Sequence, residues 1–225
     1  LADLYVAFCP CESVPASEPS RQYREFVARE RKSFQDELSE RSRSYWLARL
    51  GRDIPVLELP TDRPRPKRHT HEYEVQDLSM YRSDTEALRD LGERESCSVF
   101  VILASLLNVL LYRYTDMEEV VIGTPVATRG DGDSTRSIGV FLNVCVLKVS
   151  LSGEMLFTDL IHGVKGTVDA AFEHKHLPFD RLVEDLKIER HAGRNPLFQV
   201  MLELTDTPIL ELTGSKTIHE ATEWD

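Results

Sequence analysis

The chain has 225 residues, of which 41% are hydrophobic, enough to build a sizeable core in one large domain or two small ones. Its 27 Lys and Arg residues and 38 Asp and Glu residues give a net charge of −11, and the basic residues lie among acidic ones. This pattern argues against a surface that gathers nucleic acid or anionic lipid. The four cysteines form no Cys-x-x-Cys pair and follow no recognisable secretory leader, so we expect a reducing, cytoplasmic compartment.

The N-terminal third alternates helix and connector signals. Residues 1–8 are typical of the end of a helix, and prolines and serines make residues 10–20 an extended connector. Apolar residues at near-helical spacing then predict an amphipathic helix over residues 22–50, broken once. We favour a solvated surface over a docking surface for its charged face. Four prolines between positions 55 and 66 predict an extended crossing segment.

A strand and two helices are predicted next. Residues 72–79 alternate as a half-exposed strand, and a Ser-x-x-Glu capping box at Ser83 and Glu86 opens a helix that runs to about residue 93. Ser98 caps the following helix, residues 99–114. Its apolar run is shorter than the ~20 residues that span a bilayer, so we expect a buried helix and no membrane contact.

The second half of the chain alternates strands and helices. Runs rich in β-branched residues predict strands at 120–126, 139–151 and 197–204. Helical spacing covers residues 157–173, and Pro178 stands at the start of a further helix, PFDRLVEDL. We therefore predict an α/β fold in which helices cover a mixed β-sheet.

Two local patterns could suggest metal binding or adhesion. His69 and His71 would share one face of a strand edge, but a third ligand at matching spacing is missing. The loop ATRGDGDST contains Arg-Gly-Asp at 129–131 and a further Asp133, yet it lacks the other oxygen ligands and the closing Glu of a calcium loop. We predict an exposed basic loop and a polar turn at these places, and no metal site.

Four short segments follow one another in a fixed order. They are RQYREFVARER at 21–31, SIGVFLNV at 137–144, HKHLPFD at 174–180 and RHAGRNPLFQV at 190–200. Together they resemble the later core motifs of condensation domains from nonribosomal peptide synthetases. The family joins two carrier-bound aminoacyl groups through an amide bond.

The segment SIGVFLNV is similar to the family pattern at Gly139, Phe141 and Asn143, with Leu142 in place of the usual Val. A glycine that opens a buried strand permits close backbone approach. A buried Asn must find partners, since an unmet polar group costs ~1 to 3 kcal/mol. Bracing of the backbone and lining of a substrate tunnel both remain open for these residues.

The segment HKHLPFD is similar at His174, Pro178 and Phe179, while Lys175 and His176 stand where the family usually has Gln and Asp. A His at a helix terminus serves most often as a cap or a dipole partner. The resemblance adds a second interpretation, in which His174 contributes to the substrate channel.

The segment RHAGRNPL keeps the family residues Arg194 and Asn195 but departs from the pattern at His191 and Gly193. A guanidinium just before a buried strand needs a carboxylate, carbonyl or phosphate partner, and Asn195 can satisfy a tight turn ahead of Pro196. We favour structural pairing of Arg194 over direct chemistry.

The resemblance implies one lobe of a two-lobed, chloramphenicol-acetyltransferase-like fold. Residues 1–66 would be the end of the N-terminal lobe, with its long helix and Pro-rich crossing segment, and residues 67–225 a C-terminal lobe, incomplete at its C-terminus. The implied partners are peptidyl or aminoacyl carrier-protein domains, the missing N-terminal lobe and an adjacent adenylation domain. No cofactor would bind this chain directly, because the phosphopantetheine arms belong to the carrier domains.

The family's catalytic signature, His-His-x-x-x-Asp-Gly, does not occur in the 225 residues, so we assign no catalytic residue. Three interpretations follow. The chain is an excised part of an active condensation domain, a natural remnant that serves as a structural or docking module, or a coenzyme A-dependent acyltransferase. We favour the first, since both ends of the sequence look cut, and the third lacks a suitable catalytic His.

Overall fold

The structure is a computed structural model that describes residues 22–33, 36–51, 53–64, 66, 73–129, 137–188 and 193–205. Residues 21–203 form one compact unit, to which every element named below belongs. The helices and strands are α2 (Tyr23–Ser33), α3 (Glu37–Leu50), α4 (Arg82–Arg94), α5 (Val99–Thr115), β1 (Glu119–Ala127), β2 (Leu142–Ser150), α6 (Phe157–Glu173), α7 (Phe179–Leu186) and β3 (Val200–Met201). The predicted break in the first long helix separates α2 from α3.

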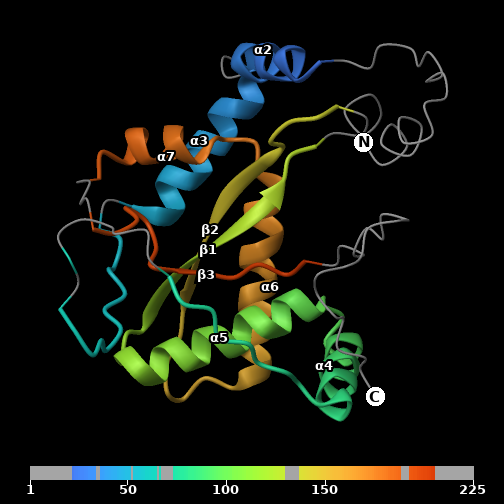
Figure 1. The fold of residues 1–225 in the computed structure, drawn as a ribbon, viewed down its shortest axis with the longest axis vertical. Helices are drawn as coiled ribbons and strands as arrows, with labels where there is room; N and C mark the ends of the chain where they lie inside the picture. Colours follow the sequence, from blue (N-terminus) through green and yellow to red (C-terminus); the bar gives the residue numbers. More distant parts are fainter. Residues whose placement is uncertain are drawn as a thin grey trace, which may run out of the picture. The chain divides into compact units, whose positions relative to one another are not determined.

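The described strands form one mixed sheet in the order β2-β1-β3 (Figure 1). β1 pairs with β2 in antiparallel register, from Glu119 opposite Ser150 to Ala127 opposite Leu142. β1 pairs with β3 in parallel, with Ile122 opposite Val200. The mixed sheet with covering helices confirms the predicted fold class.

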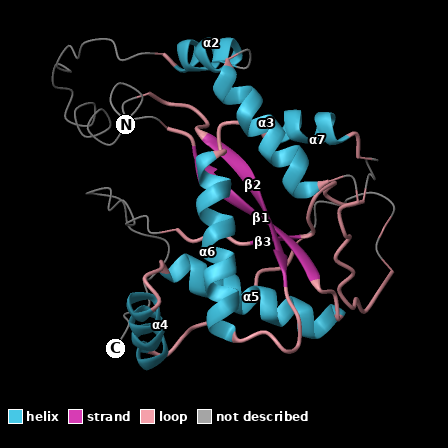
Figure 2. Ribbon diagram, turned by 180° about the vertical axis from the view of Figure 1, so that it is seen from behind, coloured by secondary structure: helices cyan, strands magenta, loops and turns pink. Residues whose placement is uncertain are grey.

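The core lies between this sheet and its helices. The middle of β1 is buried without alternation, which is the pattern of a strand covered on both faces. α6 covers one face of the sheet and crosses α5, as Figures 1 and 2 show from opposite sides. α5 begins where predicted, because the Ser98 hydroxyl accepts a hydrogen bond from the Val101 amide.

α3 lies against the outer edge of β2. The Leu151 amide donates to Glu118 and the Thr128 amide donates to Phe141, so odd-numbered residues of β2 turn their backbone groups toward β1. The Lys148 carbonyl therefore points outward, where the Arg49 guanidinium donates to it at 2.7 Å. A helix side chain thus closes part of the sheet's open edge.

Three predicted strands differ from the structure. Residues 73–79 are not a strand, and the side chains of Tyr73 and Leu78 are 88% and 94% exposed. The strand predicted from residue 139 begins at Leu142, and the one predicted for 197–204 shrinks to Val200–Met201. An alternating pattern or a run of β-branched residues indicates that a segment can form a strand. The strand forms only where the edge of another strand is available for hydrogen bonding.

The helix predicted from Ser83 exists, but its predicted capping box is wrong. The N-cap of α4 is Tyr81, two residues before Ser83, and its side chain makes no capping hydrogen bond. The Ser83 hydroxyl instead contacts the Asp84 carboxylate at 3.4 Å. The Glu86 carboxylate accepts instead from the side chain of Arg82, the first residue of α4, at 3.0 Å.

Some sequence-based predictions fall outside the described residues, namely those for His69, His71, Asp131 and Asp133 and for residues 1–20. Within the described ranges, no group of three or more His, Cys, Asp or Glu side chains could hold a metal ion. In the same ranges no single helix is long and apolar enough to cross a membrane; α4 and α5 reach that length only as a pair bent by 105°.

Candidate functional site

The turn between α6 and α7, residues 174–179, is held by one side chain from β2. The Asn143 amide nitrogen donates to the carbonyls of Lys175 and Leu177, both at 2.7 Å. The Asn143 amide oxygen accepts from the backbone amide of Phe179 at 3.0 Å. The side-chain amide of Asn143 thus joins the sheet to three backbone groups of the turn. These hydrogen bonds also give this polar side chain the partners that it needs in an apolar strand.

Pro178 and Phe179 set the start of α7 within this turn. Pro178 is the N-cap residue, and its carbonyl accepts from the Leu182 amide at 3.0 Å. The Phe179 ring lies 5.7 Å from that of Phe198. The helix therefore begins where Asn143 and an aromatic contact fix its first residue.

His174 ends α6 and contacts α3. Its side chain is buried, and its Nδ1 lies 3.1 Å from the Ser42 hydroxyl. Its ring stacks on Tyr45 with centroids 4.2 Å apart, and its carbonyl accepts from the Trp46 indole at 3.0 Å. Burial lowers the pKa of His174 below its ordinary value, so the neutral ring is favoured.

Two ion pairs flank this contact. Arg41 of α3 reaches Glu173 of α6 at 3.1 Å between exposed side chains, a pair worth little in water. Arg43 reaches Asp185 of α7 at 2.8 Å, and the hydrogen bond to this largely buried carboxylate raises the pKa of Arg43. α3 is therefore fastened to both helices that border the turn.

Gly139 and Phe141 hold α2. A Cβ at Gly139 would lie 2.2 Å from Cδ2 of Tyr23, so only a glycine admits this ring. The Tyr23 hydroxyl donates to the Val140 carbonyl at 2.9 Å. The buried Phe141 ring meets Phe26 edge-on at 4.7 Å between centroids. Gly139 lies in a bend before β2, which corrects its predicted place at the opening of the strand.

Asn195 makes the predicted tight turn. Its side-chain oxygen accepts from the amides of Leu197 and Phe198 at 3.0 and 3.4 Å. A Cβ at Gly123 of β1 would lie 2.5 Å from Cζ of Phe198, so the glycine makes room for the ring that follows this turn. Arg194 is half-buried, and its guanidinium has no hydrogen-bond or ion-pair partner among the described residues.

The structure thus gathers four predicted residues, Asn143, His174, Pro178 and Phe179, around one turn. Asn195 joins them through the contact of Phe198 with Phe179, whereas Gly139 and Phe141 lie with α2. Sequence reasoning missed Ser42 and the partners of Tyr45 and Trp46. Periodicity placed the two aromatic residues on the inner face of a helix, but no signal linked them to a residue more than 120 positions away.

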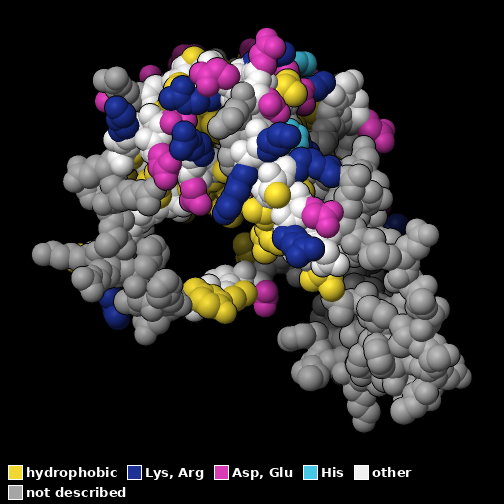
Figure 3. Space-filling view, turned by 90° about the horizontal axis from the view of Figure 1, so that it is seen from above, with side chains coloured by type: hydrophobic (Ala, Val, Ile, Leu, Met, Phe, Trp, Pro, Cys, Tyr) yellow, Lys and Arg dark blue, Asp and Glu magenta, His cyan; other side chains and the backbone are white. Residues whose placement is uncertain are grey.

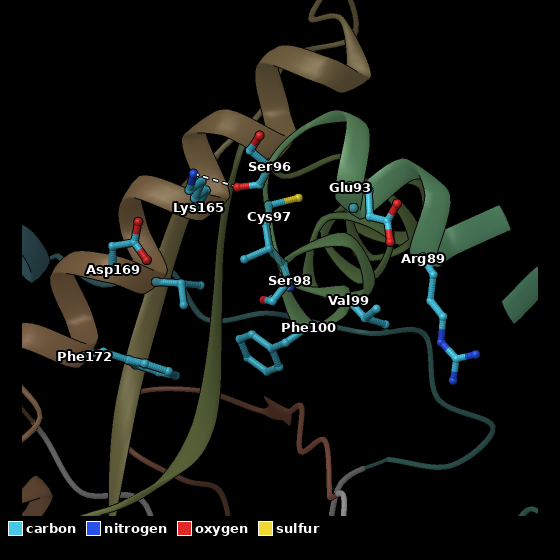
Figure 4. Close-up of a pocket in the computed structure, with 13 residues that line it drawn as sticks. Arg89, Glu93, Ser96, Cys97, Ser98, Val99, Phe100, Lys165, Asp169 and Phe172 are labelled. Atoms are coloured by element: carbon cyan, nitrogen blue, oxygen red, sulfur yellow. Dashed lines mark hydrogen bonds between the residues drawn. The ribbon is translucent and has the colours of Figure 1, made fainter. Parts of the chain in front are cut away.

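A groove of about 660 Å³ lies elsewhere, between α4, the start of α5 and α6 (Figure 4). Its lining residues are Arg89, Gly92, Glu93, Ser96, Cys97, Ser98, Val99, Phe100, Val101, Lys165, Val168, Asp169 and Phe172. Lys165 spans one wall and donates to the Ser96 carbonyl at 2.8 Å. None of the motif residues lines this groove.

The described cysteines are poor nucleophiles. Burial raises the pKa of Cys145 to about 12, and it also raises the pKa of Cys97 in the groove. Both groups are therefore thiols at neutral pH, while the reactive form of cysteine is the thiolate.

Lys and Arg side chains lie among Asp and Glu side chains on the face of the molecule in Figure 3, so this face does not carry charge of one sign only.

Comparison with known families decides the affiliation. The family model described as the condensation domain matches residues 1–223. The chain belongs to the condensation-domain family. Gramicidin S synthase 2 of Aneurinibacillus migulanus is 34% identical over 206 residues, which cover 92% of this chain and 4% of that protein. Chondramide synthase cmdD of Chondromyces crocatus is 36% identical over 201 residues, 89% of this chain and 5% of that protein. The chain therefore spans only a few per cent of these relatives.

Solved structures show the condensation-domain fold as well. The X-domain from teicoplanin biosynthesis superposes with a TM-score of 0.81 at 24% identity, over 89% of this chain and 46% of that one. The first condensation domain of the CDA synthetase gives a TM-score of 0.71 at 19% identity, over 92% of this chain and 44% of that one. The likeness confirms the predicted fold class, and this chain corresponds to less than half of either structure.

Proposed function

We propose that this chain is part of a nonribosomal peptide synthetase condensation domain. The reaction joins a donor and an acceptor aminoacyl thioester, each carried by a carrier-protein domain. The acceptor amine attacks the donor thioester carbonyl, a C–N bond forms, the C–S bond breaks, and the amine's proton leaves as the carrier thiol is released. The observation that carries this proposal is the family match over residues 1–223, which spans all four motifs in their order.

The chain's own residues would form a wall of the substrate tunnel and hold it in place. Asn143 fixes the turn at residues 174–179 from the sheet, and Asn195 fixes the turn beside it. Phosphopantetheine arms of the carrier domains would deliver both substrates, so no cofactor binds this chain directly. Tethering raises the effective concentration of each substrate, and a rigid wall preserves the geometry of attack.

Catalysis would depend on residues supplied by another part of the synthetase. We place the His-His-x-x-x-Asp-Gly segment in a preceding N-terminal lobe, and an adenylation domain beside the condensation domain, all in the cytoplasm. The exposed apolar side chains of residues 73–81 support a missing neighbour, since a run of this kind is normally covered. The half-buried Arg194, which has no partner in the described part of the chain, points the same way.

Activity assays with carrier-bound aminoacyl substrates test this proposal. The purified chain is expected to fold and to yield no dipeptidyl carrier product. The same assay on the longer protein, with the preceding lobe included, is expected to yield that product. Amide formation by the 225-residue chain alone would refute the assignment of the catalytic groups to another segment.

A non-catalytic binding module is the second candidate. It is favoured by the TM-score of 0.79 with the X-domain in its complex with OxyB, a condensation-like fold seen with a protein partner. The reading frame that precedes Leu1 separates the two candidates. A His-His-x-x-x-Asp-Gly segment there supports the enzyme, and its absence from a complete frame supports the binding module.

A further inference from the structure

His174 lies where α3, the end of α6 and the following turn meet, and its backbone amide, its carbonyl and its Nδ1 each have a partner within the fold. Its amide donates to the Ala170 carbonyl at 3.2 Å, and its carbonyl accepts from the Trp46 indole at 3.0 Å. Its Nδ1 pairs with the Ser42 hydroxyl at 3.1 Å. With 8% of the residue exposed, little water reaches the ring.

The charged and titratable groups around the ring come from three directions. α3 contributes Arg41 and Tyr45, α6 contributes Glu173, and the turn itself carries Lys175 and His176, whose pKa is also lowered by burial. Arg41 opposes a positive charge on the ring and Glu173 favours one. Glu173 is already paired with Arg41 at 3.1 Å, and its side chain is 61% exposed. Water therefore screens the electrostatic stabilisation that Glu173 could give to a protonated His174 ring.

Two neutral groups lie in the same region, Tyr45, which stacks on the ring, and Cys145, which interacts with Tyr45. Cys145 of β2 and Tyr45 of α3 both have pKa values raised by burial, so each stays protonated and uncharged at neutral pH. The C-terminal end of the α6 dipole favours a cation at this position, but the stabilisation from a single helix end is small. Desolvation is the largest influence on the ring and lowers its pKa from 6.5.

We propose that His174 is a protonation-sensitive clasp, whose neutral ring holds α3 against the α6–α7 turn and whose protonation releases α3 while β1 and β2 stay paired. A buried neutral His binds its proton less readily than the same residue in the released state. The clasp therefore contributes its full stability above pH 6.5, the ordinary pKa, and loses it as the pH falls from there through the lowered pKa of the held state. This inference stands whether or not the proposed function holds.

Hydrogen exchange followed by mass spectrometry tests the clasp in the whole 225-residue chain. Between about pH 7.5 and about pH 5.5, with intrinsic exchange rates corrected for, peptides from α3 are expected to lose protection by up to ~10-fold per pH unit in the interval between 6.5 and the lowered pKa. Peptides from β1 and β2 are expected to keep theirs. Equal protection of α3 at both pH values, or a parallel loss in the sheet, would overturn the proposal.

Two variants separate the clasp from ordinary acid sensitivity. His174→Asn keeps a side-chain oxygen that can accept from Ser42 but cannot take up a proton near neutral pH, so its α3 protection is expected not to depend on pH. His162→Asn is the matched control, because His162 lies exposed on the same helix in contact with Glu95, and it is expected to open like the parent. Acid opening of α3 in His174→Asn would contradict the proposal.

A direct titration covers the case in which His174→Asn does not fold. Long-range nitrogen–proton NMR spectra of the parent chain report the protonation of each imidazole. The His174 ring is expected to titrate below 6.5, its ordinary value. Titration at or above that value would overturn the proposal.

Discussion

The turn at residues 174–179 and the segment at residues 73–81 both lead into a helix, α7 and α4, yet they differ in what holds them. Asn143 bonds three backbone groups of the turn, and His174 is buried against α3. The other segment exposes most of Tyr73 and Leu78. A connecting segment packs against the fold where other residues supply partners for it, and apolar content alone does not supply them.

Asn143→Ala is expected to weaken the turn at residues 174–179 most, and so to reduce its difference from residues 73–81. The change removes all three hydrogen bonds, leaving two carbonyls and one amide of the turn without a protein partner. The free energy of unfolding should fall by about 3 kcal/mol, measured by urea denaturation. Asn143→Asp keeps the acceptor for Phe179 but sets a carboxylate oxygen against the two carbonyl oxygens, so it should cost at least as much as Asn143→Ala. A loss below about 1 kcal/mol in Asn143→Ala would show that the turn is held by other contacts.

Gly139→Ala is expected to follow. The added Cβ would meet the Tyr23 ring, so α2 must shift at a cost of ~1 to 3 kcal/mol in unfolding free energy. Gly163→Ala in α6 is the matched control, because a Cβ there meets nothing within 4 Å, and it should stabilise the chain by up to ~1 kcal/mol through helix propensity. Similar unfolding midpoints for both variants would contradict the close contact between Tyr23 and Gly139.

Asn195→Ala should cost about 1 kcal/mol, since two half-buried amides lose their acceptor but lie near the end of the described chain. The same denaturation measurement applies. The comparison with Asn143→Ala is informative, because the residue type is the same and the number of bonded backbone groups differs. A larger loss of unfolding free energy in Asn195→Ala than in Asn143→Ala would contradict the expectation that the turn with more bonded backbone groups depends more on its Asn.

Leu78→Ser should change the stability of this chain by less than ~0.5 kcal/mol, since its side chain is already in water. Leu160→Ser in the core is the contrasting variant and should cost several kcal/mol. In a longer protein that includes the preceding lobe, the cost of Leu78→Ser is expected to rise. An unchanged cost there would argue against coverage of residues 73–81 by that lobe.

The sequence predicted the elements whose signals are local. α5 and α6 lie within a residue or two of their predicted bounds, because spacing and a cap such as Ser98 are written into neighbouring positions. No strand forms at residues 73–79. A strand needs the edge of a partner strand, and the local sequence pattern does not show whether one is available. The need of Asn143 for partners was predictable from burial. Their identity was not, because they lie 32 to 36 positions away.

Arg49 has a consequence for handling this chain in solution. Among the described strands β2 lies at an edge of the sheet, and an edge with unpaired outward carbonyls is a template on which another molecule can add a strand. The Arg49 guanidinium occupies the outward carbonyl of Lys148 and also donates to the Thr167 hydroxyl at 3.2 Å. This charged side chain of α3 therefore places a cation at the edge strand and removes one of the carbonyls to which an added strand could bond.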